Sequence, residues 1–198
     1  MTIQQPVPDY AAARQAMVDS QLRPQGVNDP LVVQAMGSVA REQFVPEQCR
    51  PVAYLDRAVP LGDGRSLPPA AAIGQLLTAM ALQRGQSALV VGTDPGYAAA
   101  VLEAMGLDVT ATRGPIEKSH MSGGTYDAIL IDDAVEQLPG DIVNALSDGG
   151  TIGFASLDRG IFRLTVGRKS GGALGLRSIA DNTAVPGAGV NRPRAFTF

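Results

Sequence analysis

The segment that begins at Ser87 constrains the fold most, because short apolar runs alternate there with helix-forming stretches. SALVVG is a continuous apolar run, as expected of a parallel strand covered on both faces. A glycine-containing turn, TDPGY, and the helix-forming stretch AAAVLEAMG follow, with Gly106 as the helix C-cap. LDVTATR, YDAILID and TIGFAS are further strands, and a helix is expected from Val135 to Leu146. This alternation predicts an α/β fold of the Rossmann-like kind with a mainly parallel sheet.

The part of the chain before Ser87 reads as helices and one long loop. Tyr10–Leu22 favours a helix, and Asp29 followed by Pro30 is a typical helix start, with the aspartate as N-cap. Residues 51–68 are rich in proline and glycine and are expected to form a long loop with turns. A helix is expected from Pro69 to Leu82. These helices predict a cap that packs on the main sheet.

The C-terminal part of the chain breaks the alternation and is basic. FRLTVGRK and LGLRSIA, separated by SGGA, predict an antiparallel hairpin, and RAFTF a closing strand. The chain has a formal net charge of −3, yet seven basic side chains lie after residue 158. They are Arg159, Arg163, Arg168, Lys169, Arg177, Arg192 and Arg194. A solvated strand face is the simpler interpretation, and nucleic-acid binding is the alternative that we do not favour.

Composition excludes several classes of protein. The single cysteine, Cys49, cannot form an internal disulfide, which fits a reducing cytoplasm. We expect no signal peptide, and no apolar stretch approaches the roughly 20 residues of a membrane helix. The lone His120 is expected at the surface, and no metal site is expected.

The turn after SALVVG is the first candidate binding site. A strand, a glycine-rich turn and a helix form the device by which open α/β sheets bind nucleotides, and Gly92 and Gly96 stand in that turn. Taken alone, the two glycines are equally compatible with a turn that needs glycine only for its geometry.

A longer set of motifs resembles the protein-L-isoaspartate O-methyltransferase family. The pieces, in family order, are MVDSQLRPQGVNDPLVVQAM, VAREQFVPE, AYLDRAVPLGDGRSL, VVGTDPGYAAAVL, YDAILIDDAVEQLP and LSDGGTIGF. The resemblance implies a class I methyltransferase fold that uses S-adenosyl-L-methionine, and a protein or peptide acceptor bearing an isoaspartyl carboxylate. It divides the chain into a helical cap with an acceptor loop (1–82) and a Rossmann-like methyltransferase domain (83–198), joined in one compact unit.

The resemblance also names the candidate site residues. The glycine turn and the end of a later strand would bind the cofactor through Gly92, Thr93, Asp94, Gly96, Tyr97 and Asp132. Ser66 and Arg65, in the acceptor loop, are the candidate catalytic residues. We expect Asp133, beside Asp132, to cap the next helix instead.

Three departures from the family pattern are visible. In the turn, Asp94 stands where the family has its central glycine, and it would repel the cofactor's carboxylate. If that position needs a positive φ, aspartate also fits it less well than glycine. Arg113 stands near the place of an acid that binds ribose hydroxyls. In the acceptor loop, Pro68 replaces a serine, and Arg65 either pairs with an acceptor carboxylate or is solvated.

The connection after Arg113 is also short. Only 13 residues, Arg113 to Thr125, separate two expected parallel strands, and we expect that one βα unit of the family has been lost. Two hypotheses follow. The chain is an active carboxyl methyltransferase, or it is a catalytically degraded relative that serves as a binding or regulatory module with weak or no cofactor binding. The departures favour the second for the chemistry.

Overall fold

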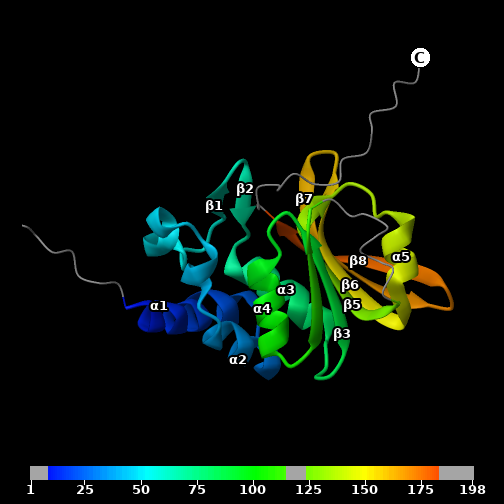
Figure 1. Ribbon diagram of the computed structural model, residues 1–198, viewed down its shortest axis with the longest axis horizontal. Helices are drawn as coiled ribbons and strands as arrows, with labels where there is room; N and C mark the ends of the chain where they lie inside the picture. Colours follow the sequence, from blue (N-terminus) through cyan, green and yellow to red (C-terminus); the bar gives the residue numbers. More distant parts are fainter. Residues whose placement is uncertain (1–8, 115–123, 183–198) are drawn as a thin grey trace, which may run out of the picture.

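The computed structural model describes residues 9–114 and 124–182 and contains a six-stranded sheet with helices on both faces (Figure 1). The strand order is β4-β3-β5-β6-β7-β8. The bounds of these strands are β3 Ser87–Gly92, β4 Asp108–Arg113, β5 Tyr126–Val135, β6 Leu146–Asp158, β7 Ile161–Ser170 and β8 Ala173–Asn182. The first four strands pair in parallel and the last two antiparallel, which confirms the Rossmann-like prediction.

The helices form two layers of unequal size. The α-helices are α1 Tyr10–Met17, α2 Pro30–Ser38, α3 Ala70–Met80, α4 Gly96–Ala104 and α5 Gly140–Ala145. A π-helical turn, Val18–Leu22, extends α1, and 3₁₀ turns cover Arg23–Gln25, Arg41–Phe44 and Glu47–Val52. In Figure 1 α1 to α4 lie on one side of the sheet and α5 on the other. No helix in the described ranges is long and apolar enough to cross a membrane.

The core consists of two apolar clusters, one on each face of the sheet. Side chains alternate along a strand, so β3 supplies Ala88 and Val90 to the larger cluster and Leu89 and Val91 to the smaller. All four are 0–1% exposed. The continuous apolar run of β3 is therefore required by burial on both faces.

Several local expectations are confirmed. Asp29 caps α2 by accepting hydrogen bonds from the amides of Leu31 and Val32 at 2.8 and 3.2 Å. The β7–β8 hairpin turns at Gly171 and Gly172, both with positive φ. The expected RAFTF strand and His120 lie outside the described residues.

Two expectations about local structure were wrong. The segment 51–68 is not only loop, because β1 (Val59–Gly62) and β2 (Arg65–Leu67) pair as an antiparallel ribbon. Their turn has positive φ at Asp63 and Gly64, and Asp-Gly is a strong hairpin signal that the sequence analysis did not use. The helix expected over Val135–Leu146 is limited to α5, since β5 continues to Val135 and Pro139 precedes the helix.

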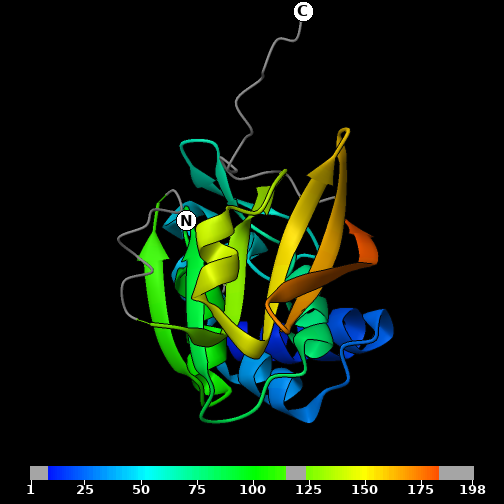
Figure 2. The same cartoon turned by 90° about the vertical axis from the view of Figure 1, so that its right-hand side faces the viewer.

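Part of the basic C-terminal segment has structural roles. The Lys169 ammonium donates to the carbonyls of Val143 and Leu146 at 2.8 and 2.6 Å, at the end of α5. Arg163 lies 3.5 Å from Asp181 on the neighbouring strand. The Lys169 contacts tie β7 to the end of α5 and the start of β6, and the Arg163 contact joins the two strands of the hairpin (Figure 2). They account for two of the basic side chains without a nucleic-acid ligand.

A polar network connects α1 to the segment that follows α2. Arg14 donates to the Tyr54 hydroxyl at 2.9 Å and pairs with Glu42 at 3.2 Å, and the Tyr54 hydroxyl donates to the same Glu42 carboxylate. Burial, together with the bond to Glu42, raises the pKa of Tyr54 to about 12, so its hydroxyl keeps its proton at neutral pH. The network satisfies three polar groups that would otherwise be costly to bury.

Tyr54→Phe should therefore lower the free energy of unfolding by about 2 kcal/mol, because it removes the hydrogen bond that the Tyr54 hydroxyl donates to the charged Glu42 carboxylate. Urea denaturation followed by circular dichroism measures this. Tyr126→Phe is the matched control, since no hydrogen bond of the Tyr126 hydroxyl is found within the described chain, and it should change stability by less than about 0.5 kcal/mol. Equal effects of the two variants would contradict the network's role.

Candidate active site

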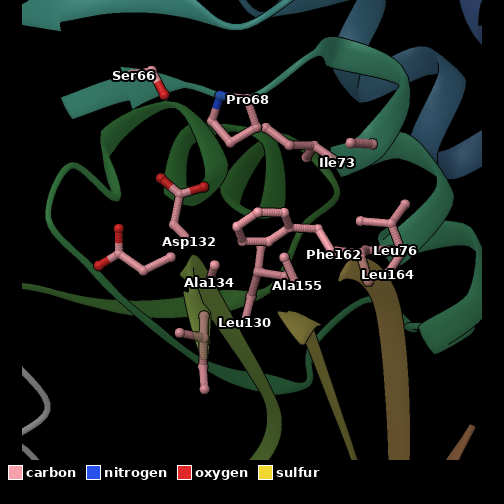
Figure 3. Close-up of a pocket in the computed structure, with 13 residues that line it drawn as sticks. Ser66, Pro68, Ile73, Leu76, Leu130, Asp132, Ala134, Ala155, Phe162 and Leu164 are labelled. Atoms are coloured by element: carbon pink, nitrogen blue, oxygen red, sulfur yellow. The ribbon is translucent and has the colours of Figure 1, made fainter. Parts of the chain in front are cut away.

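The candidate site lies at the edge of the sheet where the parallel strands end. β3 ends at Gly92, β4 ends at Arg113 and β5 continues through Asp132, so their carboxyl ends meet at one edge, where open α/β sheets bind ligands. The β1–β2 ribbon lies over this edge and contributes Ser66. Figure 3 shows Ser66 and Pro68 facing Asp132, with the ring of Phe162 beside the carboxyl group.

Asp94 and Arg113, which depart from the family pattern, form one ion-pair cluster with Arg65. The Asp94 carboxylate lies 2.8 Å from Arg65 Nη1 and 3.0 Å from Arg113 Nη2. We call this set the Arg65–Asp94–Arg113 triad. Its two guanidinium groups outweigh the one carboxylate, so the repulsion expected from Asp94 is countered within the protein. Arg65 thus pairs with Asp94, which neither of the two interpretations of its role had foreseen.

The backbone of the turn does not strain Asp94. Among the described residues other than glycine, positive φ occurs only at Asp63, Ala81 and Arg159. The condition under which glycine would have been required at position 94 is therefore not met. Aspartate is compatible with the turn, and Pro95 behind it serves as the N-cap residue of α4.

Asp133 ties the turn to β5. Its carboxylate accepts hydrogen bonds from the Thr93 amide at 2.9 Å and the Thr93 hydroxyl at 2.8 Å. Burial raises the pKa of Asp133, and the two bonds from Thr93 oppose that rise. The expectation that Asp133 caps the next helix was wrong, because α5 begins at Gly140 and has no side-chain cap.

Gly92 is required by a close approach between strands. A Cβ atom at this position would lie 2.9 Å from the Cβ of Asp132, closer than real Cβ contacts allow. Gly92 therefore permits the Asp132 side chain to lie against the end of β3. This role is geometric and does not depend on a ligand.

Arg41 is a buried residue that the sequence analysis did not single out. It is 0% exposed, its Nε donates to the Ala53 carbonyl at 2.8 Å, and its Nη2 donates to the Pro68 carbonyl. Its guanidinium lies 4.8 Å from the centre of the Tyr97 ring. One cation thus connects the cap, the acceptor loop and the helix behind the turn. Its string, VAREQFVPE, was noted, but nothing in the sequence distinguishes a buried arginine from an exposed one.

Tyr97, a candidate cofactor-binding residue, has a buried side chain. Its side chain is 1% exposed and lies between Arg41 and Phe44, whose ring centre is 5.6 Å from that of Tyr97. Any contact of Tyr97 with a ligand at the turn would therefore come from its backbone.

Asp132 differs from the other two carboxylates of the site. Within the described chain it makes no hydrogen bond or ion pair. Burial is the main reason why its pKa is raised well above the ordinary carboxyl value. The negative charges of Asp133 and Asp94 add to the rise, and the charge of Arg41 opposes it.

A small cavity lies between the acceptor loop and the end of β5. It encloses about 40 Å³ and has Ser66, Asp132 and Asp133 as its polar groups. Its other walls are mainly apolar and include Ile73, Leu76, Leu130, Phe162 and Leu164. The structure thus brings Ser66 and Asp132 to one cavity, whereas Arg65 faces the glycine turn.

Comparison with known proteins gives one consistent family. The family model of protein-L-isoaspartate(D-aspartate) O-methyltransferase matches residues 12–120. Protein-L-isoaspartate O-methyltransferase 2 of Anaeromyxobacter is 32% identical over 179 residues, which cover 77% of this chain and 73% of that protein. The protein-L-isoaspartate O-methyltransferase of Methylorubrum extorquens is 43% identical over 110 residues, which cover 56% of this chain and 48% of that protein. The chain belongs to the protein-L-isoaspartate O-methyltransferase family.

Solved structures support the fold of this family member. One is a protein-L-isoaspartate O-methyltransferase from Plasmodium falciparum in complex with S-adenosyl-L-homocysteine. It matches with a TM-score of 0.69 at 18% identity, covering 87% of this chain and 97% of that one. A second protein-L-isoaspartate O-methyltransferase gives a TM-score of 0.74 at 15% identity, covering 88% and 65%. At such identities the match shows the fold alone.

The triad leads to a prediction about the β1–β2 ribbon. In Asp94→Asn, Arg65 loses its ion pair at 2.8 Å and keeps only a 3.9 Å contact with the exposed Asp63, so amide hydrogen exchange in the ribbon should become faster. Arg113→Gln is the matched control, because it keeps the pair between Arg65 and Asp94 and should leave exchange in the ribbon near that of the wild type. Unchanged exchange in Asp94→Asn would show that the triad does not hold the ribbon in place.

Proposed function

We propose that this protein transfers a methyl group from S-adenosyl-L-methionine to the side-chain carboxylate of isoaspartyl residues in proteins or peptides. The observation that carries the proposal is the place of the cavity. Within a chain of this family, Ser66 and Asp132 face one small cavity at the carboxyl edge of the sheet, beside the glycine turn. A methyl donor at the turn and an acceptor under the β1–β2 ribbon would meet there.

The residues at this edge fit the chemical groups of the cofactor. Asp132, at the end of β5, offers negative charge for a positively charged group of the cofactor. The first turn of α4 has no side-chain cap, and the positive end of its helix dipole, with the nearby triad, suits a carboxylate. Arg113 can donate hydrogen bonds to ribose oxygens in place of the acid that would accept them.

The chemistry asks little of the protein beyond positioning. When bound, S-adenosyl-L-methionine supplies an electrophilic methyl group. An ionised acceptor carboxylate is already a nucleophile, so the protein has mainly to align it and exclude water. We assign the alignment to the Ser66 hydroxyl, which can donate a hydrogen bond to the acceptor carboxylate. The apolar walls around Phe162 and Leu164 exclude water from the reacting atoms.

The alternative is a catalytically degraded binding module. The departures from the family pattern favoured it in the sequence, but the contacts and the backbone conformation of Asp94 remove part of that support. Two of its supports were the charge and the conformation of Asp94. Arg65 and Arg113 counter that charge, and the turn does not require positive φ. Pro68 still lacks the family hydroxyl. Within the described residues β4 is the edge strand of the sheet, and no further strand pairs with its outer side. This agrees with the expected loss of one βα unit.

A cytoplasmic location belongs to the same proposal. The only cysteine of the sequence, Cys49, is free, and such usage is typical of reducing compartments. The proposed acceptors, damaged proteins and their peptides, would be met there.

The test combines binding with turnover. Calorimetry should detect S-adenosyl-L-methionine, and radiolabelled cofactor should methylate an isoaspartyl peptide but not the same peptide with ordinary aspartate. Ser66→Ala should lower kcat about tenfold, because a hydrogen bond to a charged group contributes roughly 1.5 kcal/mol, and should leave cofactor affinity unchanged. An absence of both binding and methylation at millimolar cofactor would contradict the proposal.

A further inference from the structure

The three carboxylates of the site have unequal roles. Asp133 is engaged by two hydrogen bonds from Thr93, and Asp94 by ion pairs with two arginines. Asp132 has neither kind of partner within the described chain, and it lines the cavity opposite Ser66. It is therefore the one carboxylate of the three that is free to meet a ligand.

The surroundings of Asp132 make an unpaired negative charge costly. Leu130, Phe162 and Leu164 form apolar walls of its cavity, and Gly92 packs against its Cβ. Arg41, whose positive charge acts on Asp132, is wholly buried and directs its hydrogen bonds to Ala53 and Pro68, and within the described chain its Nη1 has no partner. A carboxylate in such a place either takes up a proton or binds a cation from outside the protein.

We propose that Asp132 is the counter-ion of the cofactor's sulfonium group, so that the site prefers cationic S-adenosyl-L-methionine to its uncharged product, S-adenosyl-L-homocysteine. This inference rests on the proposed function. The two ligands differ by one methyl group and one positive charge at sulfur, and the cavity of about 40 Å³ has room for a group of that size. The ring of Phe162, beside Asp132 in Figure 3, adds cation–π attraction for the same charge.

Proton release is a direct consequence of this assignment. Burial and the charges of Asp133 and Asp94 raise the pKa of Asp132 in the free protein, and Arg41 opposes the rise. Arg65 and Arg113 face the same edge but are paired with Asp94. A bound sulfonium lowers the pKa of Asp132. Affinity for S-adenosyl-L-methionine therefore rises with pH between the two pKa values and is constant above them, whereas affinity for the uncharged product changes less.

The experiment is calorimetry of the full chain with each ligand, in two buffers of different ionisation enthalpy and over a range of pH. The wild type should release protons on binding S-adenosyl-L-methionine, and fewer on binding S-adenosyl-L-homocysteine. Asp132→Asn keeps the shape of the side chain and removes its charge. It should weaken S-adenosyl-L-methionine about tenfold, the equivalent of one pKa unit, abolish the proton release, and leave S-adenosyl-L-homocysteine within about twofold.

Ser66→Ala is the control, because Ser66 lines the same cavity but carries no charge, and its loss should affect both ligands alike. Binding of both ligands to the wild type with no difference in proton release would overturn the inference, whether or not the variants fold. Equal losses for both ligands in Asp132→Asn would overturn it too, and both results would leave the proposed function standing. Failure of the wild type to bind either ligand would instead contradict the proposed function, and the inference with it.

Discussion

The parallel pairing of β3 with β5 at the centre of the sheet determines where every site residue lies. Ala88 to Val91 pair with Ala128 to Ile131, and these apolar strands are buried on both faces. Because the strands run in the same direction, the turn after Gly92 and the carboxylates after Ile131 meet at one edge. Gly92 then allows Asp132 to approach closely. The position of the carboxylates at this edge therefore depends on the packing of the apolar strands as well as on the polar residues themselves.

The cap completes the site through contacts made by arginines. Arg65 links the β1–β2 ribbon to the turn through Asp94, and Arg41 links the ribbon's far end to the cap and to Tyr97. Residues from four separate segments are therefore fixed relative to one another. Taken singly, Asp94 and Arg113 look like losses from the family pattern. With Arg65 they form a cluster in which the negative charge of Asp94 lies between two positive charges, so the charge of each residue is offset by a neighbour.

Much of the fold could be predicted from the sequence because it depends on local signals. The apolar run of β3, the Asp29-Pro30 start of α2 and the Gly171–Gly172 turn each carry a strong local preference, and the structure confirms them. The extent of α5 and the β1–β2 ribbon were missed. In the first case a strand continued further than its apolar run suggested, and in the second the Asp63-Gly64 signal lay within a proline-rich segment.

The site was predictable in its position but not in its contacts. The turn, Ser66 and Asp132 could be named from motifs. The partners of Asp94 and Asp133 and the burial of Arg41 and Tyr97 depend on which segments meet in three dimensions, and a single sequence does not carry that information. The roles of the three carboxylates therefore became distinct only when their neighbours were known.

We infer that this edge of the sheet binds a methyl-donor cofactor despite its departures from the family pattern. A crystal structure of the chain grown with S-adenosyl-L-methionine tests it most directly. We expect the ligand along the Gly92–Tyr97 turn, with its sulfur beside Asp132 and below Ser66. A ligand bound elsewhere, or a crystal with this edge accessible and empty at saturating cofactor, would contradict it.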